Sequence, residues 1–450
     1  TPFTTSPATI PATGGFWLNG GTVTTGNLSW AINGLLRISA GALTIGTSSG
    51  NSVNYSTGSV ITIEGGTLSI AGRLGRSSSG SQVNYTQSGG TVTVVRVEST
   101  QSTYAGFDIG SAGSSFTMSG GTIVIQRATS CTSGDYYNIA STYNVTGGTL
   151  QIGNASTPDA NTMRINSTVP VGNLVVDGST GQTTKPTAQL LTNPLTIVDD
   201  VSVQTGTTLN ANNLNLTVGG NWTNNGTFTP GTGTVTFNGS SPQSINGTTG
   251  FYNFALNNAA GVSLSQAQTV AGQLTLTSGR LILGGYNLTL GVAASIGGSP
   301  GDSAMVVTNG AGALCKNYAE AGSFTFPIGE TTGSADYSPA TANFSSIAEA
   351  GTVCMRVVDA VHDPNPSTSY LSRYWDVTQA DSFGAFNCTL TFAYNDSDIV
   401  GTEGNMYGLR YDASASGQKW TRFTGVDTGA NTFQATVTGF SDYTAGDYNP

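Results

Sequence analysis

Charged side chains are scarce in this chain. Only 8% of its 450 residues are Asp, Glu, Lys or Arg, against about 25% in an ordinary soluble domain. The 24 acidic and 14 basic residues give a net charge of −10. A phosphate backbone would be repelled by this charge, and no basic stripe runs through the sequence, so the composition argues against nucleic-acid binding. With 62 glycines and abundant Thr, Ser and Asn, the surface has to be covered by neutral polar groups.

Long apolar runs are also missing. No stretch reaches the 18 or so apolar residues of a membrane-spanning helix. The sequence starts at Thr1 without the pattern of a signal peptide, which favours a processed, exported chain. The expected localisation is therefore extracellular.

Histidine is nearly absent, which limits the chemistry that the chain can perform. His362 is the only one, and a Ser-His-Asp triad would have to use it. It lies in a proline-containing loop without a nucleophile motif, so we expect no catalytic duty for it. A histidine-rich metal centre is excluded.

One acidic stretch, residues 395–403, resembles a cation-binding loop. Asp396, Asp398 and Glu403 alternate there like the oxygen ligands of a hard cation. The stretch lacks the EF-hand spacing. It predicts either a structural Ca²⁺ site, the one cofactor considered, or a polar hairpin loop.

Cysteine is sparse as well, with four residues. Cys131 stands alone among the repeats and is expected to be a buried small hydrophobe. Cys354 and Cys388 lie in strand-like runs, and we predict a disulfide between them, although Cys315 is an equally allowed partner. Disulfides are compatible with an oxidising export route.

What the chain has instead is a repeat. A pattern of alternating apolar residues on both sides of a glycine corner, polar-Gly-Gly-Thr in most copies, occurs six times before residue 153. The copies are Phe16–Thr25, Leu36–Ile45, Ile61–Ile70, Tyr85–Val94, Phe116–Ile125 and Tyr143–Ile152. Period-2 alternation around a glycine describes two short strands joined by a bend.

A repeated unit of 20 to 31 residues is typical of a solenoid. We predict a parallel β-helix in which the residues two places after the second glycine form one interior column. These residues are Val23, Leu43, Leu68, Val92, Ile123 and Leu150. The aromatic residues at the first position, Phe16, Tyr85, Phe116 and Tyr143, are expected to stack in the core.

The fold class expected is thus all-β, a parallel β-helix followed by an antiparallel β-sandwich. The domains expected are an extended segment (1–13), a regular β-helix (14–170), an irregular continuation of it (171–304) and the sandwich (305–450). In the last part, short strands with turn signals recur and aromatic residues increase. Trp375 and Trp420 are the expected core anchors there.

The C-terminal half carries a family resemblance. The run Val218–Gly239, the blocks Phe324–Gly329 and Arg373–Val377 and the closing stretch Gly439–Asp447 resemble repetitive surface proteins of Bacteroidota that use the type IX secretion system. The resemblance covers about residues 195 to 450 and implies secretion and display on a bacterial cell surface. It implies no catalytic residues. The sorting domain common in that family is not in the sequence, which suggests its removal during export.

An enzyme acting on polysaccharide needs paired carboxylates, and Glu64 is the only acid in the ladder of polar residues that precede the glycine corners. Arg73, Arg76 and Arg96 with Glu98 form the one basic cluster, interpreted as a solvated edge.

Asp302-Ser303-Ala304 matches a short O-glycosylation triplet of Bacteroidota at Ser303.

The function expected is therefore structural, without catalysis. We predict head-to-tail self-association into a fibre through the open solenoid ends and the uncharged N-terminal segment, with contacts from Thr1, Pro2, Phe3, Ile10 and Pro11. The alternative is a monomeric adhesin or carbohydrate-binding stalk whose partners are surface glycans. A polysaccharide-degrading enzyme is the third candidate.

Overall fold

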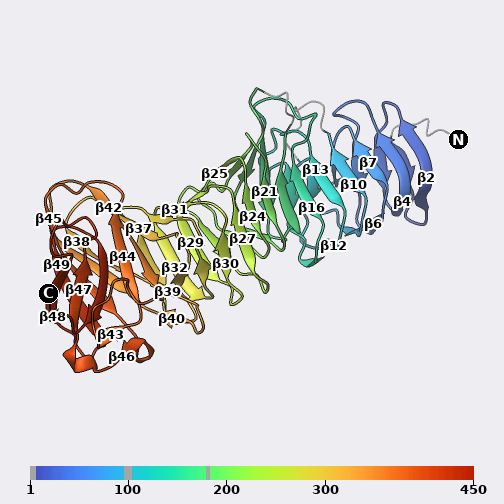
Figure 1. Ribbon diagram of the computed structural model, residues 1–450. Helices are drawn as coiled ribbons and strands as arrows, with labels where there is room; N and C mark the ends of the chain where they lie inside the picture. The colour runs from blue at the N-terminus through green and yellow to red at the C-terminus, as the bar shows by residue number, and fades with distance from the viewer. Residues whose placement is uncertain (1–6, 96–103, 179–182, 450) are drawn as a thin grey trace. The chain divides into compact units, whose positions relative to one another are not determined.

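The computed structural model describes residues 7–95, 104–178 and 183–449 (Figure 1). Thr1, Pro2 and Phe3 of the expected assembly contact lie outside these residues. Almost all regular structure is β, and the chain divides into two compact units, Thr1–Thr236 (unit 1) and Phe237–Pro450 (unit 2). In the described part of the chain, no helix is long and apolar enough to cross a membrane.

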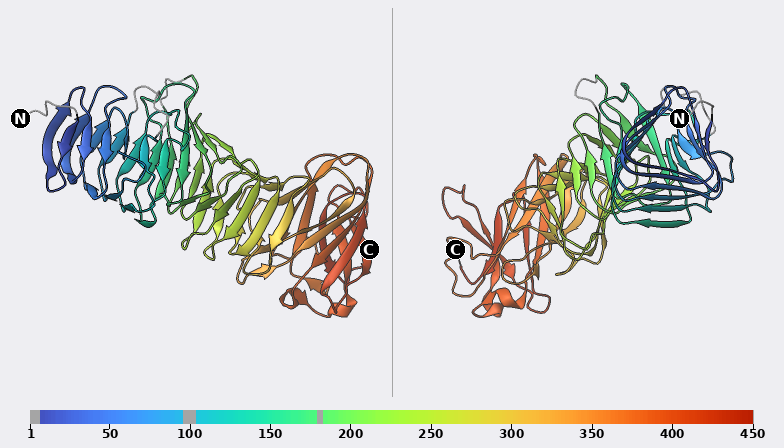
Figure 2. Two further views of the ribbon diagram at one scale, coloured as in Figure 1. Left: turned by 180° about the vertical axis from the view of Figure 1, so that it is seen from behind. Right: turned by 90° about the vertical axis from the view of Figure 1, so that its right-hand side faces the viewer.

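One face of unit 1 is a parallel sheet to which each coil contributes one strand. Its strands, in spatial order, are β1 (Ala8–Ile10), β3 (Trp30–Ile32), β5 (Val53–Tyr55), β8 (Leu74–Arg76), β11 (Phe107–Ile109), β14 (Tyr136–Asn138), β17 (Thr162–Ser167), β19 (Thr187–Leu190), β22 (Thr208–Asn210) and β25 (Thr227–Thr229). The right-hand view of Figure 2 shows the first coils overlapping in projection.

The glycine-cornered repeats form the other faces of unit 1. β2 (Gly15–Thr25) and β4 (Leu35–Ile45) run through the corner, whereas later coils have one strand on each side of it. Before the corner lie β6 (Ser59–Ile63), β9 (Val83–Gln87), β12 (Ser115–Met118) and β15 (Thr142–Val145). After it lie β7 (Thr67–Ile70), β10 (Thr91–Val94), β13 (Thr122–Ile125) and β16 (Thr149–Ile152), followed in the same row by β18 (Asn173–Val176), β21 (Val201–Val203) and β24 (Trp222–Asn224). β20 (Leu195–Ile197) and β23 (Leu216–Val218) pair in parallel beside them.

The predicted interior column exists and is longer than predicted. Strand register pairs its six members successively in parallel, and the column continues through Leu174 and Val201 to Trp222. From Leu43 onward every member is at most 2% exposed. Each apolar side chain therefore buries its surface against the equivalent residue of the next coil, which is the stabilising contact of a solenoid.

The glycine corner explains why the coils stack in register. The second glycine of every repeat has a positive φ, between 64° and 86°, at Gly21, Gly41, Gly66, Gly90, Gly121 and Gly148. A Cβ built on Gly66 would lie 2.4 Å from the carbonyl oxygen of Gly41 in the preceding coil. The corner thus requires glycine for two reasons. The backbone has a positive φ there, and the backbones of neighbouring coils approach too closely for a side chain.

The aromatic column is only partly as predicted. Tyr85 and Phe116 are buried and stack in parallel at 5.3 Å, and Phe16 meets Trp30 edge to face. Tyr143 is in register with Phe116 but 49% exposed, so the prediction that its ring lies in the core is wrong. All four side chains of β15 are exposed or half-buried, because the apolar interior at this coil is supplied by β16 and β14.

Unit 2 begins with further parallel coils. Their strands form three rows. The first row is β27 (Gln243–Asn246), β30 (Val262–Leu264), β33 (Leu281–Ile282), β36 (Val306–Val307) and β39 (Ile328–Glu330), and the second is β29 (Asn253–Asn257), β32 (Gln273–Ser278) and β35 (Ser295–Gly298). The third row is β28 (Gly250–Phe251), β31 (Gln268–Val270), β34 (Leu288–Leu290) and β37 (Leu314–Tyr318). β26 (Thr234–Phe237) spans the unit boundary. Since β36 and β39 still pair in parallel, solenoid geometry extends beyond the expected end at residue 304.

Antiparallel sheets follow, as predicted. One contains β42 (Gly351–Val358), β44 (Tyr374–Gln379), β50 (Asp442–Gly446), β43 (Tyr370–Leu371), β46 (Ile399–Val400), β47 (Tyr407–Tyr411) and β48 (Trp420–Gly425); the other contains β38 (Gly322–Phe326), β41 (Ala340–Ile347), β45 (Phe386–Ala393) and β49 (Thr432–Val437). β40 (Asp336–Tyr337) pairs with β39, and η1 (Asp396–Asp398) and η2 (Glu403–Asn405) are short 3₁₀ turns.

The two sheets enclose an aromatic core. Trp375 is fully buried and packs at 5.2 Å from Phe392, which stacks on Phe433 and Tyr443. Trp420 is 6% exposed. Both tryptophans are thus core residues, as the sequence predicted.

The disulfide differs from the preferred prediction. Cys315 in β37 is bonded to Cys354 in β42, its direct antiparallel partner. Cys388 is buried as a free thiol, whose pKa burial raises to about 12, and Cys131 is buried and free, as expected. The Cys354–Cys388 pairing is wrong because Cys388 lies in β45, which belongs to the other sheet.

These corners make a test of the fold possible. Replacing Gly66 with Ala should lower the unfolding free energy of unit 1 by more than the 1–2 kcal/mol expected for a left-handed non-glycine residue, because its Cβ also collides with the backbone of Gly41. Gly58 is the matched control, since it has a φ of 92° but no atom within 4 Å of its Cβ position. Chemical denaturation of the two variants measures the difference, and equal losses would contradict the stacking argument.

Candidate functional sites

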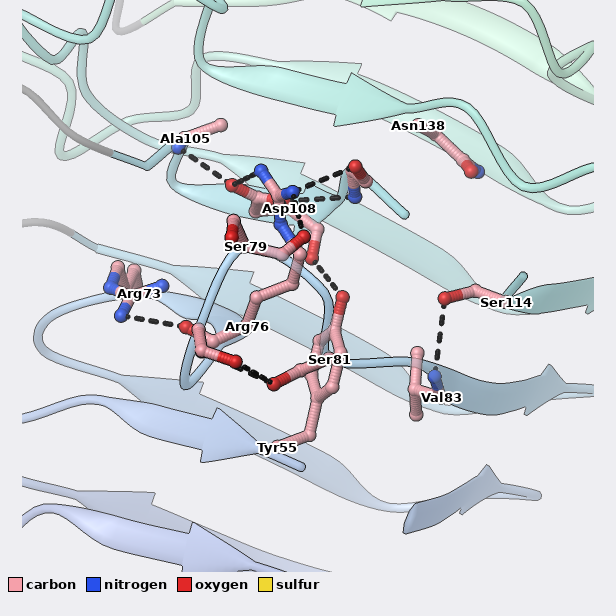
Figure 3. A network of polar contacts seen from close by, with 12 residues as sticks. Tyr55, Arg73, Arg76, Ser79, Ser81, Val83, Ala105, Asp108, Ser114 and Asn138 are labelled. Atoms are coloured by element: carbon pink, nitrogen blue, oxygen red, sulfur yellow. Dashed lines mark hydrogen bonds and ion pairs between the residues drawn. The ribbon is translucent and has the colours of Figure 1, made fainter. Parts of the chain in front are cut away.

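Buried charge in unit 1 is concentrated around Asp108 in β11. The Arg76 guanidinium donates from Nε and Nη2 to the two oxygens of Asp108, at 2.9 and 3.3 Å. Its Nη1 donates to the carbonyl oxygens of Ser79 and Gly110. Asp108 is fully buried and Arg76 nearly so, so this is a bidentate pair shielded from solvent (Figure 3).

Neighbouring groups complete the Asp108 network. Backbone N–H groups of Ala105 and Gly110 donate to the carboxylate, and the Tyr55 hydroxyl donates to the main-chain oxygen of Asp108 at 2.8 Å. Burial raises the pKa of Tyr55 well above its usual range. The two carboxylate oxygens of Asp108 therefore accept four hydrogen bonds, two from Arg76 and two from the backbone.

The basic cluster of the sequence is not a solvated edge. Arg73 and Arg76 are 8% and 9% exposed, and both guanidinium groups pack over the ring of Tyr104, at 4.6 and 5.1 Å. Arg73 also donates to Asn54 at 2.7 Å. The interpretation as a solvated edge is wrong for these two residues, because each finds polar partners on adjacent coils. Arg96 and Glu98 lie outside the described residues.

A second buried pair lies farther along the same sheet. Asp135, immediately before β14, accepts hydrogen bonds from the backbone N–H groups of Thr129 and Arg164 and lies 3.5 Å from Nε of Arg164. Burial raises the pKa of Asp135, partly offset by the Arg164 N–H. Arg164 in β17 in turn donates to the carbonyl oxygens of Thr129 and Cys131.

Three ion pairs between described residues of unit 1 share one property. Arg37–Glu64, Arg76–Asp108 and Arg164–Asp135 each join residues 27 to 32 positions apart, which is one coil. The Arg37–Glu64 pair is the solvent-exposed one of the three, and the ring of Trp17 lies 4.8 Å from its guanidinium. Each pair therefore fastens one coil to the next, and each carboxylate is matched with an arginine instead of a second acid.

Unit 2 has one buried arginine with several acidic neighbours. Arg373 Nη2 lies 2.6 Å from Asp398, 3.1 Å from Asp336 and 3.8 Å from Glu330. Nη1 donates to the Ser338 hydroxyl. Burial raises the pKa of both Glu330 and Asp398. The cluster ties β39, β40 and η1 to the strand that begins at Tyr374, and arginine is the residue type suited to so many acceptors.

The side chains of the predicted cation-binding loop, residues 395–403, contact other residues of the protein. Asp398 turns inward to Arg373, whereas Asp396 accepts from Asn431 and Glu403 accepts from the Tyr394 hydroxyl. The structure thus disperses the three predicted Ca²⁺ ligands. No group of three or more His, Cys, Asp or Glu side chains in the described ranges is placed to hold a metal ion.

His362 lies in an aromatic enclosure. The rings of Tyr374, Tyr411 and Trp420 surround it at 4.7 to 5.2 Å, and Nε2 lies 3.0 Å from Asp442. The loop histidine of the sequence is thus a nearly buried packing residue, 5% exposed. Its carboxylate partner was not apparent from the sequence because the two residues are 80 positions apart.

The remaining predicted residues are distributed over the surface and the first coil. Ile10 is buried in β1, which pairs with β3 of the same chain, and Pro11 follows it on the surface. Ser303 is exposed in the turn Gly301–Ala304, and its glycosylation stays a prediction. Trp30 and Trp222 are core residues, whereas Trp17 is 56% exposed.

Comparison of the chain with protein-family models, with characterised proteins and with solved structures gives no match.

The buried pair predicts a clear difference between two carboxylates. Asp108→Asn should lower the unfolding free energy of unit 1 by about 3–5 kcal/mol, because it leaves the buried Arg76 without its counter-ion. Glu64→Gln is the control, since the Arg37–Glu64 pair is solvent-exposed and screened, and it should change stability little. Denaturant titration measures both, and similar losses would contradict the assigned roles.

The Arg373 cluster predicts a pH effect on unit 2. Because the folded-state pKa of Glu330 is raised above its ordinary value of 4.5, the unfolded chain releases this proton first, and stability falls as the pH rises from about 4.5 through the folded-state pKa. Glu330→Gln should remove this loss. Unfolding free energies measured across this range should therefore diverge, the variant gaining on the wild type with rising pH. Parallel curves would contradict the prediction.

Proposed function

We propose that this chain is a non-enzymatic structural protein of a bacterial surface that assembles head to tail into a fibre. The β-solenoid fold is consistent with a structural or adhesin-like role. The observation that carries the assembly step is the open first coil of unit 1.

In the part of the chain that the structure describes, two strands of the first coil have a neighbouring strand on one side only. Among the described residues, β1 pairs only with β3, and β2 pairs only with β4. The outer edge of the eleven-residue β2 therefore offers backbone donors and acceptors to another strand. Proteins that avoid such pairing place charges or prolines on their edges, but β2 contains neither.

Gly21 marks the place where another coil would fit. A Cβ on the equivalent Gly41 would collide with the Gly21 carbonyl, 2.4 Å away, because a coil is stacked there. Among the residues that the structure describes, a Cβ on Gly21 meets nothing within 4 Å. The first coil thus has the backbone surface that every later coil uses for stacking, and a strand from a second copy is the occupant that we propose.

The partner surface in the second copy is proposed to belong to its C-terminal unit. A contact between two different surfaces repeats without closing and produces a filament when its rotation does not close a ring. The role expected for Ile10 changes, because β1 adds to its own chain and extends the edge instead of reaching to a neighbour.

Surface location is supported by the resemblance to type IX-secreted proteins, by the very low charge and by the Cys315–Cys354 disulfide. The absence of catalysis is supported by the pairing of the buried carboxylates with arginines. Trp17, exposed beside Arg37, is the specific feature that favours the alternative, a glycan-binding adhesin.

Assembly can be tested at Gly21. The purified wild-type chain should form elongated particles in electron micrographs as its concentration rises, and Gly21→Ala should raise the concentration needed about tenfold or more, because its Cβ intrudes on the stacking surface. Gly58→Ala carries the same backbone cost away from the edge and should assemble like the wild type. A wild-type chain that stays monomeric by sedimentation at high concentration would overturn the proposal.

A further inference from the structure

A cavity of about 580 Å³ opens on unit 2 beside the strands β44, β47 and β50. This volume lies within the range of small-molecule sites, about 300–1,000 Å³. Two of the sequence blocks singled out above, Arg373–Val377 and Gly439–Asp447, contribute to its wall through Asp376 and through Phe440 and its neighbours. The fibre proposal uses none of these residues.

The wall of the cavity has an apolar part. Phe386 and Phe440 both line it, and their rings stack at 4.8 Å with planes inclined by 21°. Phe386 is 7% exposed and Phe440 is half-buried, so Phe440 offers the more accessible ring surface. An aromatic face of this kind suits the C–H face of a sugar ring, which is apolar while its edge carries hydroxyls.

Some polar groups at the rim keep hydrogen-bonding capacity that the described chain does not use. The exposed side chains of Thr378, Gln379 and Thr438 line the cavity and make no hydrogen bond to the described chain. Asp376 and Asp442 each use only Oδ2, bound to Arg356 and His362 respectively. Hydroxyl, amide and carboxylate groups arranged around an aromatic ring give both donors and acceptors for the hydroxyls of a sugar.

Charge decides which sugars fit. The lining contains three carboxylates, Asp376, Asp412 and Asp442, and a single guanidinium, Arg410, which is already bound to Asp412 at 3.2 Å. An acidic sugar would be repelled from this wall, whereas a neutral or an amino-substituted sugar would not. We propose that the cavity binds a pyranose sugar that is neutral or carries an amino group.

The test uses the full chain and defined probes. Saturation-transfer difference NMR with the methyl glycosides of glucose, galactose and mannose, and with glucosamine, should show transfer to at least one of them, and none to glucuronate. The double variant Thr378→Ala/Gln379→Ala should weaken that binding about tenfold, because each lost hydrogen bond contributes about a factor of three. Thr438→Ala should weaken it about threefold.

Gln418→Ala is the control, since Gln418 is an exposed glutamine of the same unit that does not line the cavity. It should leave binding unchanged, and thermal unfolding should be unaltered in all variants because the side chains removed are exposed. No transfer from any neutral or amino sugar, transfer to glucuronate, or full affinity in the folded double variant would each overturn the proposal. Fibre formation is measured separately, so either proposal can fail alone.

Discussion

The approach of one glycine corner to the carbonyl of the preceding corner is the contact on which the solenoid of unit 1 depends. At Gly66 the backbone of one coil fills the space that a side chain would need, so adjacent coils cannot shift along each other without a collision. This fixes the register, and the register places Leu68 over Leu43 and under Val92. Burial of the apolar column is then a consequence of the corner, because an in-register stack is the one that keeps every apolar residue inside.

With the backbone so constrained, charges have a restricted role. Three arginines of unit 1, Arg37, Arg76 and Arg164, each reach across one coil spacing to a carboxylate of the neighbouring coil, as Arg76 does to Asp108. Such a pair contributes little net stability but is costly to break. It therefore discourages alternative registers, which would leave both ions buried and unpaired. The fixed register of the coils thus favours a sequence with few charges, in which the buried charges have partners of opposite sign.

Local pattern was sufficient to predict the coils, the interior column and most sandwich strands, because alternation around glycine is a property of neighbouring residues. It placed Tyr143 in the core, because alternation alone does not show which of two neighbouring strands supplies the interior of a coil. The ion pairs and the disulfide could not be predicted in this way, because they join residues that are far apart in the sequence. Nothing near Asp398 in the sequence indicates that Arg373 will face it, and nothing near Cys354 distinguishes Cys315 from Cys388, since strand order decides both.

β37 has a position of its own in unit 2. It hydrogen-bonds in parallel to β34 on one side and antiparallel to β42 on the other, where the Cys315–Cys354 bond joins the two strands. β37 is therefore one of the links between the parallel coils of unit 2 and its antiparallel sheet, and the ion pairs of Arg373 with Glu330 and Asp336 are another. The covalent link between β37 and β42 prevents the two strands from sliding apart, and reduction of the disulfide would leave this junction held by the strand hydrogen bonds.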